Sequence, residues 1–426
     1  MAEIAGSAPG KAGATAAMTT ADGRPLALAL RHAERIKRWK ALFLVLPLLL
    51  FLGATFLYPI TLMLFRSVEN PVVADNLPRT LAALETWDGR DLPEEAVFAA
   101  LAADLGEARE NKTFGRLATR VNQELSGTRT MIMRTARRVA RLDAPFKEAV
   151  ITAHPGWSRP ETWAAIQRLG ARYTPIQYLA AVDLRYDLQG DIVAQPEARQ
   201  IYRNLFLRTF WMSVVVTLAC LLLGYPIAYL LATLPTRSAN LLMILVLLPF
   251  WTSLLVRTTS WIVLLQTQGV VNDLLVWLGI IGDDQRIQMI FNAQGTVVAM
   301  TQILLPFMIL PLYSVMKTIP DSYMRAAQSL GASRFYAYWR VYVPNTLPGI
   351  GAGCLLVFIL AIGYYITPAL VGGEDGQMIS NLIAFHMQKS LNWSLAAALG
   401  GILLAGVIAL YWLYNRLVGV ERLKLG

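Results

Sequence analysis

Six runs of about twenty predominantly apolar residues constrain this chain more than any other feature. A helix rises about 1.5 Å per residue, so about 20 apolar residues cross the roughly 30 Å hydrocarbon core of a bilayer. We therefore predict an all-α, polytopic membrane protein with six transmembrane helices. A water-soluble globule is excluded, because only 15% of the residues are charged, against about 25% in soluble domains. The runs cover residues 42–65, 209–234, 241–266, 296–316, 349–370 and 394–414.

The first run is expected to stay in the mature chain as a transmembrane helix over residues 41–65. It is too long for the apolar region of a secretory signal, and no small-residue cleavage site ends it. Residues 1–40 precede it and are rich in Ala, Gly, Thr and basic side chains. We expect them to form a disordered, basic segment in the cytoplasm.

The positions of Lys and Arg around the runs predict the orientation in the membrane. Thirteen of them flank the spans on the side of the N-terminus, whereas only Arg286 and Lys389 lie in the short loops on the other side. Both termini are therefore expected in the cytoplasm. The long segment 66–208 is then extracytoplasmic, and residues 209–426 form transmembrane helices 2 to 6.

Segment 66–208 has the charge content of a soluble domain. It holds 18 of the 28 acidic and 20 of the 38 basic residues. Two possible capping boxes, Asp91-x-x-Glu94 and Ser158-x-x-Glu161, and apolar residues at helical spacing predict a helical insertion. One predicted helix has an arginine face, for which two interpretations remain: a solvated face balanced by nearby acids, or a docking surface for a partner or lipid headgroups. These arginines are Arg134, Arg137, Arg138 and Arg141.

Metal and nucleic-acid sites are not expected. Cys220 and Cys354 both lie inside apolar runs, where a small core residue is the ordinary interpretation. The histidines, His32, His154 and His386, are far apart and match no metal-binding motif. The net charge of +10 comes mainly from basic residues that flank the apolar runs, not from a folded basic surface, so we expect no nucleic-acid partner.

The loop 317–344, between the fourth and fifth runs, is the most informative segment. We expect a short helix from near Asp321 that halts at Gly331, and a second helix that ends before Pro344. The small pair Ala326 and Ala327 permits close approach of a partner surface. An exposed helical knob of this kind suits insertion into a cleft of another protein. Four aromatic residues are predicted to be buried: Phe335, Tyr336, Tyr338 and Trp339.

The spacing of this loop resembles a known signature. Ala326-Ala327-x3-Gly331-x9-Val341-x-Val343-Pro344 is similar to the E-A-A-x3-G-x9-I-x-L-P loop of bacterial ABC importer permeases, which in that family forms the coupling helix seated in the ATPase subunit. Arg325 stands where the family has Glu. The resemblance implies an ATPase-coupling role for Arg325, Ala326, Ala327, Gly331, Ala332, Val341, Val343 and Pro344.

Other stretches resemble the polyamine/opine-type (spermidine/putrescine-like) branch of that family, over about residues 40–65 and 200–420. They are 223–230 (LGYPIAYL), 248–253 (LPFWTS) with Arg257-Thr-Thr-Ser-Trp261, and 305–312 (LPFMILPL). The insertion 66–208 departs from the family pattern. The resemblance implies a multi-pass permease of the bacterial inner membrane, with the insertion in the periplasm.

The same resemblance implies partners. They are a second six-helix permease subunit, forming a heterodimer, two copies of a cytoplasmic ATPase and a periplasmic solute-binding protein. ATP and Mg are then bound by the ATPase, so this chain is expected to carry no cofactor and to be no enzyme.

The substrate path is expected where polar groups lie at membrane depth. Arg257 is sixteen residues into the third run, roughly 24 Å above its cytoplasmic end. It is interpreted either as a ligand for a carboxylate or part of an outer gate, or as a group that reaches the interface or pairs with Asp273. The full set of path residues is Trp251, Thr252, Ser253, Arg257, Thr258, Trp261, Tyr364 and Tyr365.

The sequence does not identify the solute. A polyamine favours carboxylates along its path, yet none of the six runs contains Asp or Glu. Aromatic faces bind cations too, so a polyamine, an opine or an amino-acid-like solute all fit. Two other functions are alternatives to an importer permease: a self-contained channel or secondary transporter, and a membrane sensor with a ligand-binding external domain.

Overall fold

Helices make up nearly all of the regular structure in the described part of this chain. A computed structural model describes residues 26–187 and 190–418. Five of the described helices are long and apolar enough to cross a membrane, or six if one bent pair counts as a single span. The prediction of a polytopic helical membrane protein is thus confirmed. The chain divides into two units, residues 1–63 and 64–426, and each is described by itself.

The first unit contains the first candidate span, Lys37–Val68, which continues into the second unit. Its helix α1 begins at Leu26, so the expected disorder of residues 1–40 is wrong for residues 26–40. These residues are rich in Ala, Leu, Arg and Lys, which have high helix propensity. Residues 1–25 lie outside the described part. The elements are α1 (Leu26–Leu52), a π-helical turn η1 (Gly53–Leu57) and α2 (Tyr58–Val68).

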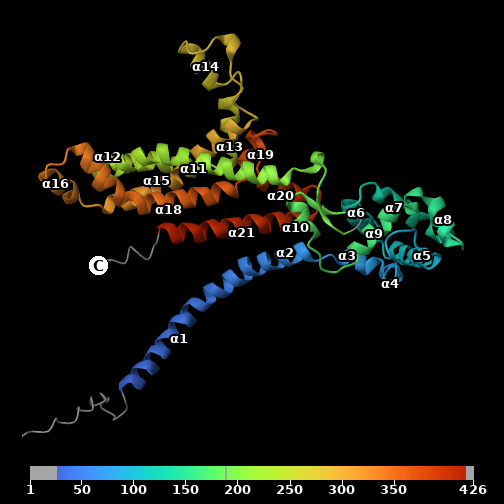
Figure 1. The fold of residues 1–426 in the computed structure, drawn as a ribbon. Coiled ribbons are helices and arrows are strands. Elements are labelled where there is room, and N and C mark those ends of the chain that lie inside the picture. Colours follow the sequence, from blue (N-terminus) through green and yellow to red (C-terminus); the bar gives the residue numbers. More distant parts are fainter. Residues whose placement is uncertain (1–25, 188–189, 419–426) are drawn as a thin grey trace, which may run out of the picture. The chain divides into compact units, whose positions relative to one another are not determined.

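Three long helices of the second unit, α11, α15 and α18, pack side by side (Figure 1). Their buried core includes Val216 of α11, Leu312 of α15 and Val357 of α18. Gly353 permits α18 to approach α15 closely, because a Cβ atom at this position would lie only 2.7 Å from Sδ of Met308. The bounds of the long helices are α11 (Tyr202–Thr233), α15 (Ala293–Thr318), α18 (Val343–Ile362) and α21 (Trp393–Val418).

The third predicted span, 241–266, is not one helix. The chain bends by 97° between Thr236–Trp251 and Leu254–Trp277. Pro249 lies in the short 3-10 turn before the bend, and Ser253 starts a new helix by accepting a hydrogen bond from the Val256 N–H at 3.2 Å. The sequence did not predict this break, because the length and hydropathy of an apolar run do not show whether its helix is straight or bent. The elements are α12 (Thr236–Leu247), η5 (Leu248–Trp251), α13 (Leu254–Leu265) and α14 (Val270–Trp277).

The fifth span begins earlier than predicted and is interrupted near its end. The helix runs without a stop from Arg334 to Ile362, so the expected end before Pro344 is wrong. A π-helical turn, in which the Val343 N–H donates to the Tyr338 carbonyl, precedes the proline and accommodates its ring. The chain leaves the helix at Gly363. The remaining elements here are α17 (Arg334–Ala337), η7 (Tyr338–Tyr342) and α19 (Ile366–Val371).

The insertion is helical, as expected, with one small hairpin. Trp157 and Trp163 are fully buried in its core, and Phe98 packs edge-on against Trp163 at 4.7 Å between ring centroids. The elements are α3 (Pro71–Asn76), α4 (Pro78–Leu84), α5 (Glu95–Glu110), α6 (Phe114–Glu124), α7 (Thr128–Arg138), η2 (Val139–Arg141), α8 (Phe146–Ala153), η3 (Pro155–Ser158), α9 (Pro160–Leu169), α10 (Ile176–Ala181), antiparallel β1 (Leu184–Tyr186) and β2 (Ile192–Ala194), and η4 (Glu197–Arg199).

Both predicted capping boxes in the insertion are wrong. Helices α5 and α9 begin at Glu95 and Pro160, and the residues before them give no side-chain cap. Pro160 occupies the first turn of α9, where its missing N–H costs nothing. Glu95 instead accepts hydrogen bonds from the backbone N–H groups of Phe146 and Lys147, which start α8.

The base of the insertion packs on the bundle. Helix α10 contacts α21, and Tyr178 Oη accepts a hydrogen bond from Ser67 Oγ at 2.9 Å. Asp183 follows α10 and accepts hydrogen bonds from the N–H groups of Ile201, Tyr202 and Arg203 at the start of α11. An anion at a helix N-terminus is stabilised by the helix dipole. The insertion and the second span are therefore joined by a buried carboxylate.

Candidate functional site

The predicted coupling loop forms an exposed helix. Helix α16 (Asp321–Ser329) follows α15, and no residue of it is buried. It ends as predicted, because Gly331 has a φ of +89° and its N–H donates to the Gln328 carbonyl at 3.0 Å. Only glycine adopts this left-handed conformation without strain. The chain then turns into α17, where the Ser333 side chain accepts a hydrogen bond from the Tyr336 N–H at 3.3 Å.

Large apolar side chains stand exposed around this turn. We call Leu330, Phe335, Tyr336 and Trp339 the knob surface; Leu330 is 90% exposed and Phe335 75%. The predicted burial of Phe335, Tyr336 and Trp339 is therefore wrong. Tyr338 alone faces inward, at 5.5 Å from the Tyr229 ring of α11. Contiguous exposed apolar residues of this size mark interaction sites.

The other residues of the loop signature differ in their exposure. Arg325 and Ala326 are exposed on α16, while Ala327 and Ala332 are half-buried. Within the part of the chain that the structure describes, Arg325 forms no ion pair. Further on, Val341 and Val343 are half-buried and Pro344 is exposed.

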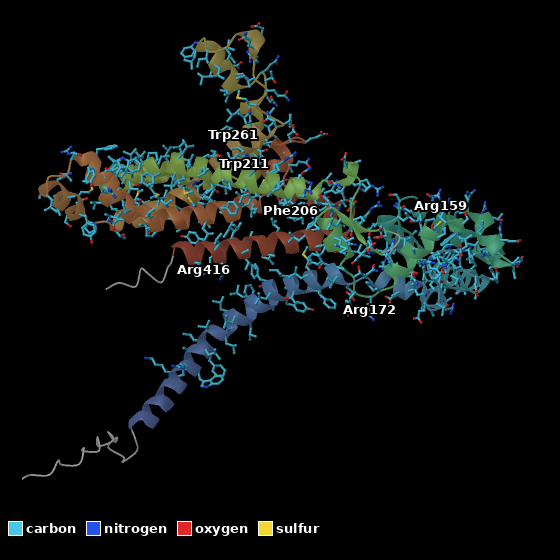
Figure 2. All side chains as sticks on the ribbon, viewed as in Figure 1. Arg159, Arg172, Phe206, Trp211, Trp261 and Arg416 are labelled. Atoms are coloured by element: carbon cyan, nitrogen blue, oxygen red, sulfur yellow. The ribbon has the colours of Figure 1, made fainter. Side chains whose placement is uncertain are left out.

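A second site lies at the bend of the third span. A cavity of about 310 Å³ brings together Thr252, Arg257 and Trp261 of the predicted path. Trp261, on α13 (Figure 2), donates from Nε1 to Oε1 of Gln302 on α15 at 3.1 Å. The lining residues are Leu248, Pro249, Thr252, Val256, Arg257, Ser260, Trp261, Leu264 and Gln302.

Arg257 carries the one charge in this cavity. Its Nε atom is buried and makes no hydrogen bond. The expected pairing with Asp273 is wrong: Asp273 accepts from Arg286 at 2.7 Å, and Asp283 binds the same guanidinium. The hydrogen bonds that Arg286 donates to these two carboxylates raise its pKa. The expected height of roughly 24 Å assumed one straight helix, whereas the chain bends by 97° before α13.

The remaining path residues lie outside this cavity. Trp251 is exposed, and Ser253 caps α13. Thr258 points to α19, where its hydroxyl lies 3.3 Å from that of Thr367. Tyr364 and Tyr365 occupy the interruption between α18 and α19; Tyr364 is half-buried and Tyr365 exposed.

The backbone at this interruption is satisfied by side chains that sequence reasoning missed. Ser380 Oγ donates to the Tyr364 carbonyl at 2.5 Å and Asn381 Nδ2 to the Tyr365 carbonyl at 2.8 Å, both from α20 (Ile379–Gln388). Unwound backbone at membrane depth needs such partners. Gln302 was missed as well, although a polar side chain inside an apolar helix is a usable signal.

No metal site is evident in the described ranges, which contain no group of three His, Cys, Asp or Glu residues placed to hold an ion. This applies to both sites and to the insertion.

Comparison with known proteins places these features in a family. Residues 222–419 match the family described as binding-protein-dependent transport system inner membrane component. The spermidine/putrescine transport system permease protein PotB of Escherichia coli (strain K12) is 37% identical over 221 residues, covering 51% of this chain and 80% of PotB. PotB of Haemophilus influenzae is 35% identical over 226 residues, covering 51% and 78%.

A more distant relative and a solved structure each match about half of the chain. The molybdenum transport system permease protein ModB of Mycobacterium bovis is 31% identical over 198 residues, covering 46% of this chain and 71% of ModB. The structure of a bacterial ABC transporter involved in import of the acidic polysaccharide alginate covers 50% of this chain and 80% of that chain, with 19% identity and a TM-score of 0.40.

The chain therefore belongs to the family of binding-protein-dependent transport system inner membrane components. It is the transmembrane permease subunit of an ABC importer, in the branch that contains PotB. As a transport subunit it is not an enzyme. Family membership favours this function over a self-contained channel, a secondary transporter or a sensor.

Proposed function

We propose that this subunit forms half of the translocation pathway for a small organic solute delivered by a periplasmic binding protein. The observation that carries the proposal is the exposed helix α16 with its knob surface, where Leu330 is 90% exposed. Burial of these exposed apolar side chains in a cleft of a partner protein is energetically favourable. The partner is a cytoplasmic ATPase, present in two copies, which binds ATP and Mg.

The proposed topology has six spans, with both termini in the cytoplasm. The bent pair, Thr236–Trp251 and Leu254–Trp277, supplies the third span. The insertion, which the helix bounds limit to residues 69–201, lies in the periplasm. The distribution of Lys and Arg supports this orientation, and it places α16 on the cytoplasmic side with the ATPase.

A second six-helix permease completes the pathway as a heterodimer. ATP closes the two ATPase subunits, and the coupling helices carry this movement to the permease pair, which alternates between outward and inward access. The solute binds the two states with different affinity, and this difference biases the cycle. The cavity around Arg257 and Trp261 is the part of this chain proposed to contact the solute.

The solute is proposed from the relatives and from the chemistry of the cavity. The name of PotB gives spermidine and putrescine as its solutes, and the Trp261 face supports a cation through cation–π contact. Arg257 has no carboxylate beside it in the cavity lining. It therefore equally supports an opine or amino-acid-like solute, whose carboxylate it would bind.

A glycine substitution in the loop tests this function without knowledge of the solute. In Gly331→Val, a β-branched residue at a φ of +89° is strained by about 1–2 kcal/mol and α16 loses its orientation. Gly331→Asn is the matched control, because Asn tolerates this conformation. The measured quantity is ATP hydrolysis, stimulated by the binding protein, of the assembled complex in proteoliposomes.

We expect Gly331→Val to lose this stimulation while the permease is still inserted, and Gly331→Asn to keep most of it. Stimulation that is equal in Gly331→Val and the wild type would contradict the coupling role. Uptake of labelled putrescine and of L-arginine by the same proteoliposomes then separates a polyamine from an amino-acid-like solute.

A further inference from the structure

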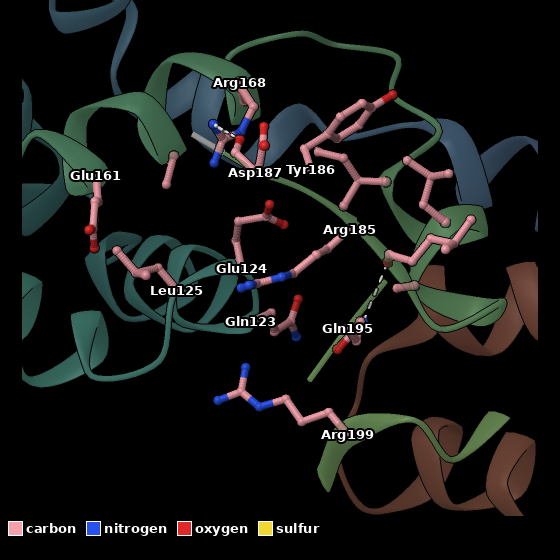
Figure 3. A pocket seen from close by; sticks show the side chains of 15 residues that line it. Gln123, Glu124, Leu125, Glu161, Arg168, Arg185, Tyr186, Asp187, Gln195 and Arg199 are labelled. Carbon is pink, nitrogen blue, oxygen red and sulfur yellow. Dashed lines mark hydrogen bonds between the residues drawn. The ribbon is translucent and has the colours of Figure 1, made fainter. Parts of the chain in front are cut away.

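A second and separate cavity lies within the insertion. It has a volume of about 370 Å³, inside the range of about 300–1,000 Å³ that is usual for small-molecule sites. It is lined by the end of α6, by α9 and α10, and by the hairpin and η4 that follow (Figure 3). None of its lining residues lines the cavity around Arg257.

The lining of this cavity is rich in charge of both signs. Figure 3 shows the Glu124 and Arg185 side chains reaching into its middle. In the described parts of the chain, none of the six charged lining residues forms an ion pair. These side chains are therefore not paired with one another and remain able to bind a ligand. They are Glu124, Glu161, Asp187, Arg168, Arg185 and Arg199.

Arg168 has one hydrogen-bond donor that is satisfied and one that is not. Its Nη1 donates to the Asp187 carbonyl at 3.1 Å, which fixes the guanidinium against the hairpin. Its Nε is buried without a hydrogen-bond partner. A buried donor without a partner is costly, and the carboxylate of a small solute would satisfy it.

Glu124 provides the opposite charge. The nearby Arg120 does not neutralise it by direct contact: Nε of Arg120 donates to Asn70 Oδ1 at 2.7 Å, and burial lowers the pKa of Arg120, with the charge of Glu124 opposing the shift. Glu161 stands on α9, on another wall of the cavity, and is exposed. These carboxylates would accept hydrogen bonds from an ammonium group.

We propose that this cavity binds a small zwitterionic solute of the amino-acid class. Its carboxylate binds Arg168 and Arg185, and its ammonium group binds Glu124 and Glu161. The amides of Gln123 and Gln195 suit a polar side chain on the solute. A solute with both charges satisfies both sets of residues, whereas a diamine or a dicarboxylate leaves one set unpaired.

The position of the cavity connects it to the membrane bundle. Leu179 and Ala180 of α10 line it, and the same helix packs against α21 through Tyr178 and Ala181. Binding in the cavity would therefore stabilise the helix on which the insertion rests. This site is distinct from the translocation pathway proposed above and does not depend on it.

Equilibrium binding to the full chain in nanodiscs tests this proposal, with L-glutamine as the probe and putrescine and succinate as comparisons. Glu124→Gln and Arg185→Gln should each weaken L-glutamine binding by about tenfold or more, because a hydrogen bond to a charged group is lost. Glu110→Gln and Arg129→Gln are matched controls, since both residues are exposed in the insertion and outside the cavity. They should leave the affinity unchanged.

Three outcomes would overturn the proposal. The first is no saturable binding of L-glutamine, and the second is binding of putrescine or succinate that is as tight. The third is L-glutamine binding that Arg257→Gln weakens and Glu124→Gln does not, which would locate the probe in the membrane cavity. Glu124 and Arg185 lie outside the core, so we expect the thermal unfolding midpoint of both variants to match the wild type, which separates lost binding from lost folding.

Discussion

Thr258 Oγ1 lies 3.3 Å from Thr367 Oγ1, and this contact joins α13 to α19. Each of these helices is the first to follow a break: α13 follows the 97° bend, and α19 follows the interruption after α18. Both threonines are 0% exposed. A buried polar contact thus connects the third and fifth spans, both of which are broken. It lies next to the cavity that contains Arg257.

Removal of either hydroxyl should weaken this connection. We expect Thr258→Val and Thr367→Val each to lower the free energy of unfolding by about 1 kcal/mol, because each removes the buried hydrogen bond between the two hydroxyls. The double variant should cost less than the sum, since both remove the same contact. Denaturant titration of the detergent-solubilised chain measures this, and strict additivity would show that the two hydroxyls do not interact.

Substitutions in the cavity around Arg257 should affect solute transport and not the assembly of the transporter complex. We expect Arg257→Gln to lower solute uptake about tenfold, because the only charged group of the lining is lost. Trp261→Phe, which removes the hydrogen bond to Gln302 Oε1, should have a smaller effect of the same sign. Lys389→Gln serves as the control, an exposed cation outside the cavity. Equal uptake by Arg257→Gln and Lys389→Gln would exclude Arg257 from the path.

The carboxylate of Asp183 should be important for the junction between insertion and bundle. It accepts three backbone hydrogen bonds, of which the one from Arg203 is 2.7 Å long. We expect Asp183→Ala to lower the free energy of unfolding by about 2 kcal/mol. Asp183→Asn should cost about half as much, because Asn keeps one acceptor and tolerates the φ of +60°. An alanine variant as stable as the asparagine variant would contradict this capping role.

His386 should make the contact between α20 and α11 sensitive to acid. Burial lowers its pKa below the ordinary value of 6.5, and its Nε2 lies 3.2 Å from Tyr202 Oη. Between the lowered pKa and 6.5 the unfolded state binds more protons than the folded state, so stability should fall as pH falls through this window. His386→Gln should remove this part of the pH dependence. Thermal unfolding between pH 5 and 8 measures it, and identical profiles for both proteins would refute it.

The spans were predictable from the sequence, while their breaks were not. Apolar length alone indicated the helices that the structure begins at Tyr202, Ala293 and Trp393. The bend at Ser253 and the interruption after Gly363 depend on which polar groups satisfy the freed backbone. Those groups come from other helices, such as Ser380 for the Tyr364 carbonyl, and no local pattern predicts them.

In each of the two sites, some features were predictable from the sequence and others were not. The end of α16 at Gly331 was predictable, since a local backbone conformation needs glycine there. The exposure of Phe335 and the burial of Tyr338 were not, because Tyr229 of α11 decides which face turns inward. Arg257 was found as a charge at membrane depth, but Gln302 was missed because it joins the cavity from α15.

The affinity of the full chain, solubilised in detergent, for its ATPase subunit tests the central claim most directly. Leu330→Asp places a charge on the most exposed residue of the knob surface, whereas Ile192→Asp places one on a 56% exposed residue of the insertion hairpin. If α16 is seated in the ATPase, Leu330→Asp should weaken binding by about tenfold or more and Ile192→Asp should leave it unchanged. Equal affinity of Leu330→Asp and the wild-type chain would contradict the account.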